Sequence, residues 1–149
     1  MKEFNKKLEL GLSGRTFSFV SKKASLDFNF YKEVKLLKIL HQDKPFSVIS
    51  SEKSSVKTEK LNSGLALTSI EFTKDIKKVK LKLFQENAEN VEFYAIKYWN
   101  KKSEKNSNTY SNFGVSGGRF SQLLESKLLF SQMKSLEPGL FVLTLGTND

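Results

Sequence analysis

The chain has 149 residues, with 25 lysines and arginines against 16 aspartates and glutamates, which gives a formal net charge of +9. This length suits one domain, and a hydrophobic share of 38% with 13 phenylalanines argues against a disordered chain. The absence of cysteine excludes disulfides and thiolate metal sites, and no apolar run is long enough for a membrane span or a signal peptide. We therefore expect a cytoplasmic protein, not membrane-bound, with anionic partners.

The first patterned region lies between residues 6 and 40, where β-branched and aromatic residues alternate with polar ones. The alternation is clearest in residues 24–31, where one face holds Ala24, Leu26, Phe28 and Phe30. This period of two predicts a half-buried strand. Residues 31–41 fit either a helix with an apolar stripe that begins at Val34 or a strand with a slip in register, and we favour the strand.

Two polar stretches, residues 50–62 and 100–112, predict solvated loops or edge strands. The segments that follow them, residues 65–76 and 113–124, align with each other without gaps. Each aligned segment fits a short strand that runs directly into a helix, so the sequence predicts an internal repeat.

A hydroxyl residue marks the start of each predicted helix, Thr68 in the first copy and Ser116 in the second, because it can accept a hydrogen bond from free backbone amides. Glu71 completes a capping box in the first copy, whereas the second copy has Arg119 at that position. Apolar residues then recur at helical spacing, at Ile70, Phe72, Ile76 and Val79 and at Phe120, Leu123, Leu124, Leu128 and Leu129. We predict an α+β fold of two antiparallel β-sheets, each followed by a helix, in a single domain over residues 1–149 with halves at 6–79 and 80–134 and a tail at 135–149.

The second half resembles the DNA-binding domain of the coactivator positive cofactor four, in which a strand ending in Tyr-Trp and a polar turn precede a strand that leads into a helix. The matching segments are residues 91–99, which end in Tyr98-Trp99, and residues 113–123. The Whirly family has two such units in one chain. The internal repeat predicted above resembles this arrangement.

The Whirly signature Lys-Gly-Lys-Ala-Ala-Leu is similar to residues 21–26 here, with Ser21 and Lys22 in place of the Lys-Gly pair and Ser25 in place of the second Ala. The resemblance implies a single-stranded DNA-binding protein that forms homo-oligomers, with a tetramer favoured. A short, lysine- and asparagine-rich chain with no organelle presequence looks most like the phage-encoded single-strand-binding relatives, which implies the host cytoplasm.

Independently of that resemblance, residues 78–84 alternate so that Val79, Leu81 and Leu83 point inward and Lys78, Lys80 and Lys82 point outward. Alternate residues of a strand lie about 6.8 Å apart, close to the spacing of phosphates in an extended single strand. The alternative interpretation is an edge strand that lysines protect against aggregation.

A binder without sequence preference also needs exposed rings on which bases stack. The candidate rings are Tyr31, Tyr94, Tyr98, Trp99 and Tyr110. Each of these rings has the alternative of packing in the core with its polar tip at the surface. The predicted nucleic-acid-binding residues are Lys22, Lys23, Tyr31, Lys78, Lys80, Lys82, Tyr94, Lys97, Tyr98, Trp99, Lys101 and Lys102. Lysine suits phosphates more than base edges, and Arg15 and Arg119 are the only arginines.

The sequence has no evident catalytic constellation. Residues 114–118 match Gly-x-Ser-x-Gly, but the only histidine, His41, precedes Ser116 instead of following it. Carboxylates such as Glu86 and Glu89 lack the spacing of a metal site. We expect neither an enzyme nor a protein with a metal or cofactor.

These patterns together predict a single-stranded DNA-binding protein with little sequence preference, acting in DNA replication, recombination or transcription. The alternatives are an RNA-binding protein of the same fold and a basic protein-interaction module.

Overall fold

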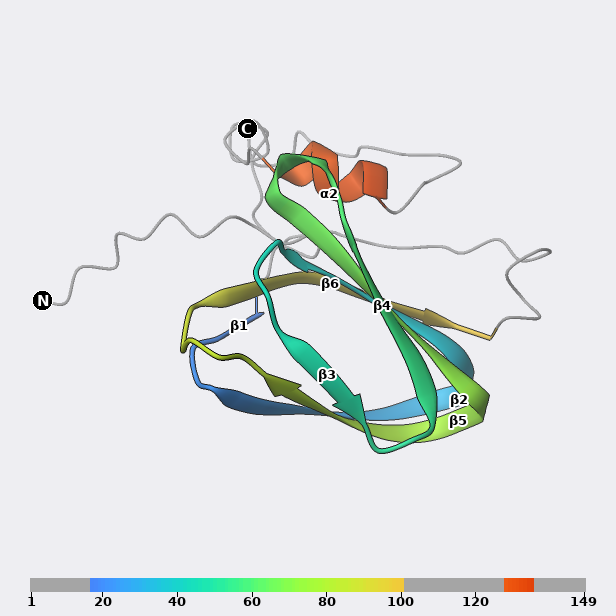
Figure 1. The fold of residues 1–149 in the computed structure, drawn as a ribbon. Helices are drawn as coiled ribbons and strands as arrows, with labels where there is room; N and C mark the ends of the chain where they lie inside the picture. The colour runs from blue at the N-terminus through green and yellow to red at the C-terminus, as the bar shows by residue number, and fades with distance from the viewer. Residues whose placement is uncertain (1–16, 101–127, 136–149) are drawn as a thin grey trace, which may run out of the picture.

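A computed structural model of the chain describes residues 17–100 and 128–135, most of which lie in β-strands. The elements in chain order are β1 (Phe17–Phe19), β2 (Lys23–Gln42), β3 (Ser47–Ser50), β4 (Ser54–Lys60), the 3-10 turn η1 (Asn62–Gly64), β5 (Leu65–Phe84), β6 (Val91–Trp99) and the helix α2 (Leu129–Ser135). Figure 1 shows the strands as one curved layer with α2 near one end.

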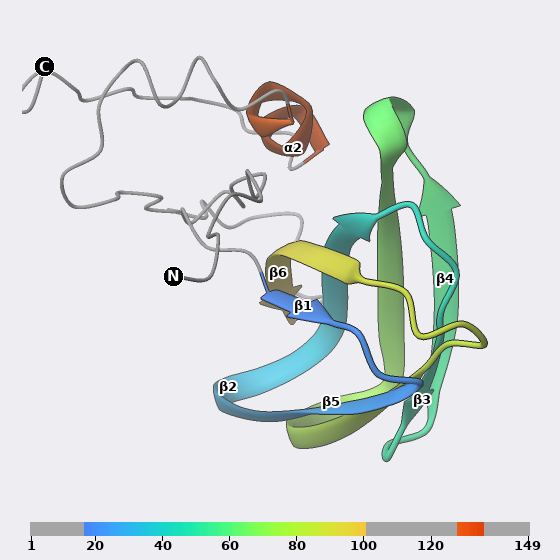
Figure 2. The same ribbon diagram turned by 90° about the vertical axis from the view of Figure 1, so that its left-hand side faces the viewer.

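All the strand pairings are antiparallel, and the described strands form a single sheet in the order β1-β6-β2-β5-β3, with β4 also paired to β5. β3 pairs with residues 81–84 of β5 and β4 pairs with residues 66–72. Because β2 occupies the other edge of β5 along its length, β3 and β4 lie one after the other on the same edge (Figure 2).

The two longest strands, β2 and β5, are strongly bent. Their register shifts between Asn29 and Val34 and again between Val34 and Leu36, and irregularities of this kind bend a strand and increase its twist. Figures 1 and 2 show both strands curving. We call the side of the sheet enclosed by this curve the inner face and the opposite side the outer face.

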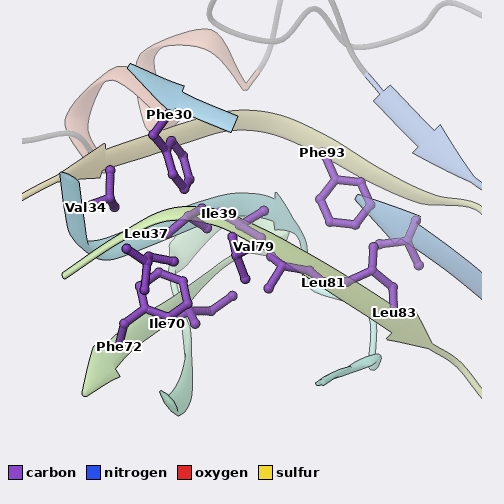
Figure 3. Close-up of a cluster of buried hydrophobic side chains, with 12 residues drawn as sticks. Phe30, Val34, Leu37, Ile39, Ile70, Phe72, Val79, Leu81, Leu83 and Phe93 are labelled. Carbon is purple, nitrogen blue, oxygen red and sulfur yellow. The ribbon is translucent and has the colours of Figure 1, made fainter. Parts of the chain in front are cut away.

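The inner face holds the main hydrophobic core (Figure 3). Its buried side chains are Phe30, Val34, Leu37, Ile39, Ile70, Phe72, Ile76, Val79, Leu81, Leu83, Val91 and Phe93. Two further rings close one end of the core, because Phe19 and Phe46 each contact Phe93, with ring centroids 5.6 and 5.5 Å apart. Burial of this much apolar surface is the main force that stabilises the curvature of the sheet.

A second, smaller apolar cluster lies on the outer face, where α2 packs against the sheet. Leu129 of α2 is buried with Leu40, Leu65 and Tyr94. Leu128 and Met133 pack around this cluster from the same segment. The helix therefore covers only one end of the outer face.

The strand predictions for residues 24–41 are confirmed, whereas residues 6–16 of the predicted strand region lie outside the described residues. In residues 24–30 the apolar side chains pack toward the inner core and the polar ones are exposed, as the alternation predicts. Residues 31–41 continue the same strand, and the slip in register is the irregularity that brings Val34 and then Leu37 to the inner face. The polar stretch at residues 50–62 contains the edge strand β4.

The predicted α+β fold with two sheets, each followed by a helix, is wrong. The described residues form one antiparallel sheet with a single short helix, and residues 65–84 are one continuous strand. The stripe that suggested a first helix contains Ile70 and Phe72, which alternate toward the inner core, and Ile76 and Val79, which follow after the bend. β5 forms backbone ladders with β2 on one side and with β3 and β4 on the other, and this two-sided pairing stabilises the extended form.

The predicted capping box at Thr68 is wrong for the same reason. Thr68 is the fourth residue of β5 and is buried, with its Oγ1 2.9 Å from His41 Nε2 and 2.8 Å from Thr58 Oγ1. Glu71 follows in the same strand. The second copy of the expected repeat, residues 113–124 with Ser116, lies outside the described residues, as do the tail at 136–149 and most of the polar stretch at 100–112.

Candidate nucleic-acid interface

Three lysines of β5 lie in a line on the outer face of the sheet. Lys78, Lys80 and Lys82 are exposed, because Val79, Leu81 and Leu83 between them are held in the inner core. We call these three residues the lysine row. Alternate residues of a strand stand about 6.8 Å apart, so the row presents ammonium groups at intervals that suit successive phosphates.

Two carboxylates lie near the lysine row: Glu52, which shares a surface hollow with Lys78 and Lys80 and pairs with Lys74, and Asp27 on β2. The residues of β2 opposite it are Asn29, Asp27 and Ser25, which pair with Lys78, Lys80 and Lys82 respectively. Asp27 Oδ1 lies 3.5 Å from Lys80 Nζ, and both side chains are at least half exposed. Such an exposed ion pair contributes little to stability and exchanges readily for a phosphate.

The other two lysines of the row have no acidic partner among the described residues. Lys78 and Lys82 therefore present unneutralised charge, and Lys23 adds a further exposed cation on β2, where it pairs with Phe84. Lys22 lies in the exposed turn just before β2. The structure thus brings five predicted lysines together around one part of the outer face.

The exposed ring nearest in sequence to this surface is Tyr31. Its side chain is 94% exposed, and it lies two residues beyond Asn29, in the irregular segment at the bend of β2. A fully exposed tyrosine beside lysines is able to stack on a base of any kind. The described side chains give Tyr31 no other packing role.

A second group of cations lies on the outer face beyond the bend. Lys38 of β2 pairs directly opposite Lys97 of β6. Their ammonium groups lie 5.1 and 5.2 Å from the centroid of the Trp99 ring, within the range of a cation–π interaction. We call Lys38, Lys97 and Trp99 the tryptophan cluster.

Neither Lys38 nor Lys97 forms a direct ion pair with an acidic side chain in the described residues. Like charges directly opposite each other on a sheet are unfavourable, and the Trp99 ring offsets part of that cost. The nearby Glu59 is hydrogen-bonded to Lys57, which lowers the pKa of the Glu59 carboxyl, and the more distant Lys38 lowers it further. The cluster is therefore a second group of partly exposed cations on the outer face, and a candidate contact for an anion.

The remaining predicted site residues lie elsewhere. Tyr94 is only 3% exposed and lies in the apolar cluster beneath α2, where its hydroxyl donates to Glu92 Oε2 at 3.0 Å, so its ring has no free face for a base. Tyr98 is 52% exposed but points to the inner side, with its ring 4.8 Å from that of Phe30. Lys101, Lys102 and Tyr110 lie outside the described residues.

Lys38 is the residue that sequence reasoning missed. It lies in a segment that was ambiguous between helix and strand, and only the pairing of β2 with β6 brings it opposite Lys97. A strand assignment with the correct register would have placed it on the outer face, because its neighbours Leu37 and Ile39 are buried in the core.

The only histidine is a structural residue. His41 is buried, its Nδ1 lies 2.7 Å from the carbonyl oxygen of Gln42, and its Nε2 faces the Thr68 hydroxyl. Since a carbonyl only accepts, Nδ1 carries the proton and Thr68 donates to Nε2. Burial lowers the pKa of His41, although the hydrogen bond to Gln42 and the charge of Asp43 oppose the shift.

The described residues contain no group of three or more histidines, cysteines, aspartates or glutamates that would hold a metal ion. In the same residues, no helix is long and apolar enough to cross a membrane. No protein-family model, no curated protein and no solved structure matches this chain. The Whirly resemblance therefore stays a prediction, and the outer face itself carries the candidate site.

Proposed function

We propose that this chain binds single-stranded DNA with little sequence preference through the outer face of its sheet. The observation on which the proposal rests is the lysine row, in which Lys78, Lys80 and Lys82 are exposed at regular intervals with only Asp27 as an acidic neighbour on the paired strand. A regular line of cations recognises a repeating anion, and the phosphate backbone of a polynucleotide is such an anion.

The type of cation supports binding without sequence preference. Lysine is a hydrated point charge that attracts phosphate but does not form the planar bidentate contacts by which arginine recognises guanine. No arginine lies in the described residues. In this proposal phosphates contact the lysine row and bases stack on Tyr31, whose ring every base can use equally.

Such a protein acts where single strands are exposed, as in DNA replication, recombination or transcription, and we place it in the cytoplasm. We also expect it to act as a homo-oligomer, because several copies on one strand add their affinities.

The test is fluorescence anisotropy with labelled oligomers of equal length: two unrelated single-stranded DNA sequences, the matched RNA and the matched duplex. We expect similar affinities for the two single-stranded DNAs, weaker binding to the duplex, and a log-linear loss of affinity with salt concentration. Tighter binding to the RNA would reassign the ligand, because only RNA offers a 2′-hydroxyl. Equal or tighter binding to the duplex would refute the preference for single strands. No binding of any nucleic acid would refute the proposal and favour an acidic protein partner.

A further inference from the structure

The strand β4 forms a margin of the described sheet (Figure 2). It pairs with β5 along one edge, and no strand among the described residues pairs with its other edge. A free edge presents a row of backbone N–H and C=O groups that can pair with another strand.

The backbone groups of β4 that point away from β5 can be identified from its end contacts. The Thr73 N–H donates to the Lys53 carbonyl at 3.0 Å, and the Leu61 N–H donates to the Leu65 carbonyl at 2.8 Å. Hydrogen-bonded and non-hydrogen-bonded residues alternate along an antiparallel strand, so the odd-numbered residues of β4 bond to β5. The N–H and C=O groups of Val56, Thr58 and Lys60 therefore point outward from the free edge.

We propose that β4 pairs antiparallel with β4 of a second copy of this chain, with Thr58 opposite Thr58 of the second copy at the twofold axis. In this register Val56 lies opposite Lys60 of the second copy, and Lys60 lies opposite Val56 of the second copy. Together with the Thr58 pair this makes three residue pairs that exchange two backbone hydrogen bonds each, six in all. An antiparallel pair of edge strands of this kind has the self-complementary geometry of a twofold dimer.

The charges of β4 select the same register. With Thr58 on the axis, Lys57 lies opposite Glu59 of the second copy, and Glu59 lies opposite Lys57. These are non-hydrogen-bonded positions, where opposing side chains approach most closely, and opposite charges there are favourable. A slip of two residues in either direction would place Lys57 on Lys57 or Glu59 on Glu59, which is unfavourable.

Within one chain, Lys57 and Glu59 already form an ion pair on the outer side of the strand. Their side chains are 75% and 53% exposed, so both are free to exchange this contact for the equivalent one across the axis. Lysines on an edge also protect monomeric sheets from aggregation, and that alternative predicts a chain that stays monomeric.

Self-pairing through β4 has a geometric consequence. The twofold axis of an antiparallel strand pair is perpendicular to the sheet, so the outer faces of both copies lie on the same side. Both lysine rows then face in one direction. The inference itself depends only on β4 and would stand if the ligand proved to be something else.

The test is sedimentation equilibrium of the full chain over a range of concentrations. We expect the wild type to form a dimer reversibly. Association should be at least tenfold weaker in Glu59→Lys or Lys57→Glu, because each single variant places two residues of the same charge opposite each other across the axis. The exchanged double variant, Lys57→Glu with Glu59→Lys, keeps the net charge and restores opposite pairs, so its association should return to near the wild-type constant.

Amide hydrogen exchange checks the strand itself. The N–H groups of Val56, Thr58 and Lys60 should exchange slowly in the wild type, and those of Val56 and Lys60 should exchange quickly in Thr58→Pro. This variant removes the outward Thr58 donor and its side-chain hydrogen bond to Thr68, but no backbone hydrogen bond to β5. A wild type that is monomeric at every concentration, or an exchanged double variant that associates as weakly as the single ones, would overturn the proposal. Either result would leave salt-dependent binding to single strands unaffected.

Discussion

Replacing Lys78 and Lys82 with glutamine should weaken the binding of single-stranded DNA about 25-fold at about 0.1 M salt. These are the two members of the lysine row with no acidic partner in the described residues, whereas Lys80 first has to leave Asp27. Each phosphate contact contributes about 0.7 to the slope of log affinity against log salt for single strands, so two contacts contribute about 1.4. At about 0.1 M, one decade below the 1 M reference, a slope of 1.4 corresponds to a factor of about 25.

The assay is an anisotropy titration at several salt concentrations, which gives the affinity and the slope together. The matched control replaces Lys44 and Lys74 with glutamine, which changes the net charge equally but removes lysines that are paired with Glu89 and Glu52. The control should lose less than threefold in affinity with an unchanged slope. An equal loss in both double variants would mean that only net charge matters, and an unchanged slope in the row variant would refute phosphate contacts at the row.

Three further predictions concern single residues. Asp27→Asn should tighten single-strand binding a few fold, because it frees Lys80 for phosphate; weaker binding would contradict this role. Trp99 is the only tryptophan, so single-strand binding should quench the intrinsic fluorescence. Trp99→Ala should cost about 1 kcal/mol, at the low end for stacking because Lys38 and Lys97 both already lie over the ring. Unchanged emission at saturation would remove this ring from the site. Burial lowers the pKa of His41 in the folded state, so as the pH drops the unfolded chain binds a proton at this residue before the folded chain does. The free energy of unfolding should therefore fall between about pH 7.5 and about pH 5.5, by at most about 1.4 kcal/mol per pH unit. This slope should vanish in His41→Gln, and a slope that persists there would assign it to another group.

The sequence predicted the strands of this fold better than their arrangement. Alternation in residues 24–30 and 78–84 identified the inner and outer faces correctly, because each segment has one solvent-exposed side and one side packed in the core. The helix predicted after Thr68 failed because its apolar stripe includes residues from both sides of the bend in β5. A bend shifts the period of two, and the shifted pattern imitates a helical one.

The candidate site divides in the same way between local and long-range information. The lysine row depends on alternation within one strand, so the sequence was sufficient to find it. The tryptophan cluster depends on the register between β2 and β6, which no local pattern specifies. The burial of Tyr94 depends on α2, which docks from a distant part of the chain.

The bend in β2 and β5 gives a physical reason for a preference between single and double strands. The lysine row and the tryptophan cluster share the outer face, but they lie on opposite sides of the bend, so a ligand that touches both has to follow the curve of the sheet. Duplex DNA is stiff over about 150 base pairs and resists such curvature, whereas a single strand adapts to it. Tyr31, 94% exposed, lies in the irregular segment where the ligand would turn. The strand irregularity that misled the helix prediction is therefore the feature that would discriminate against a duplex.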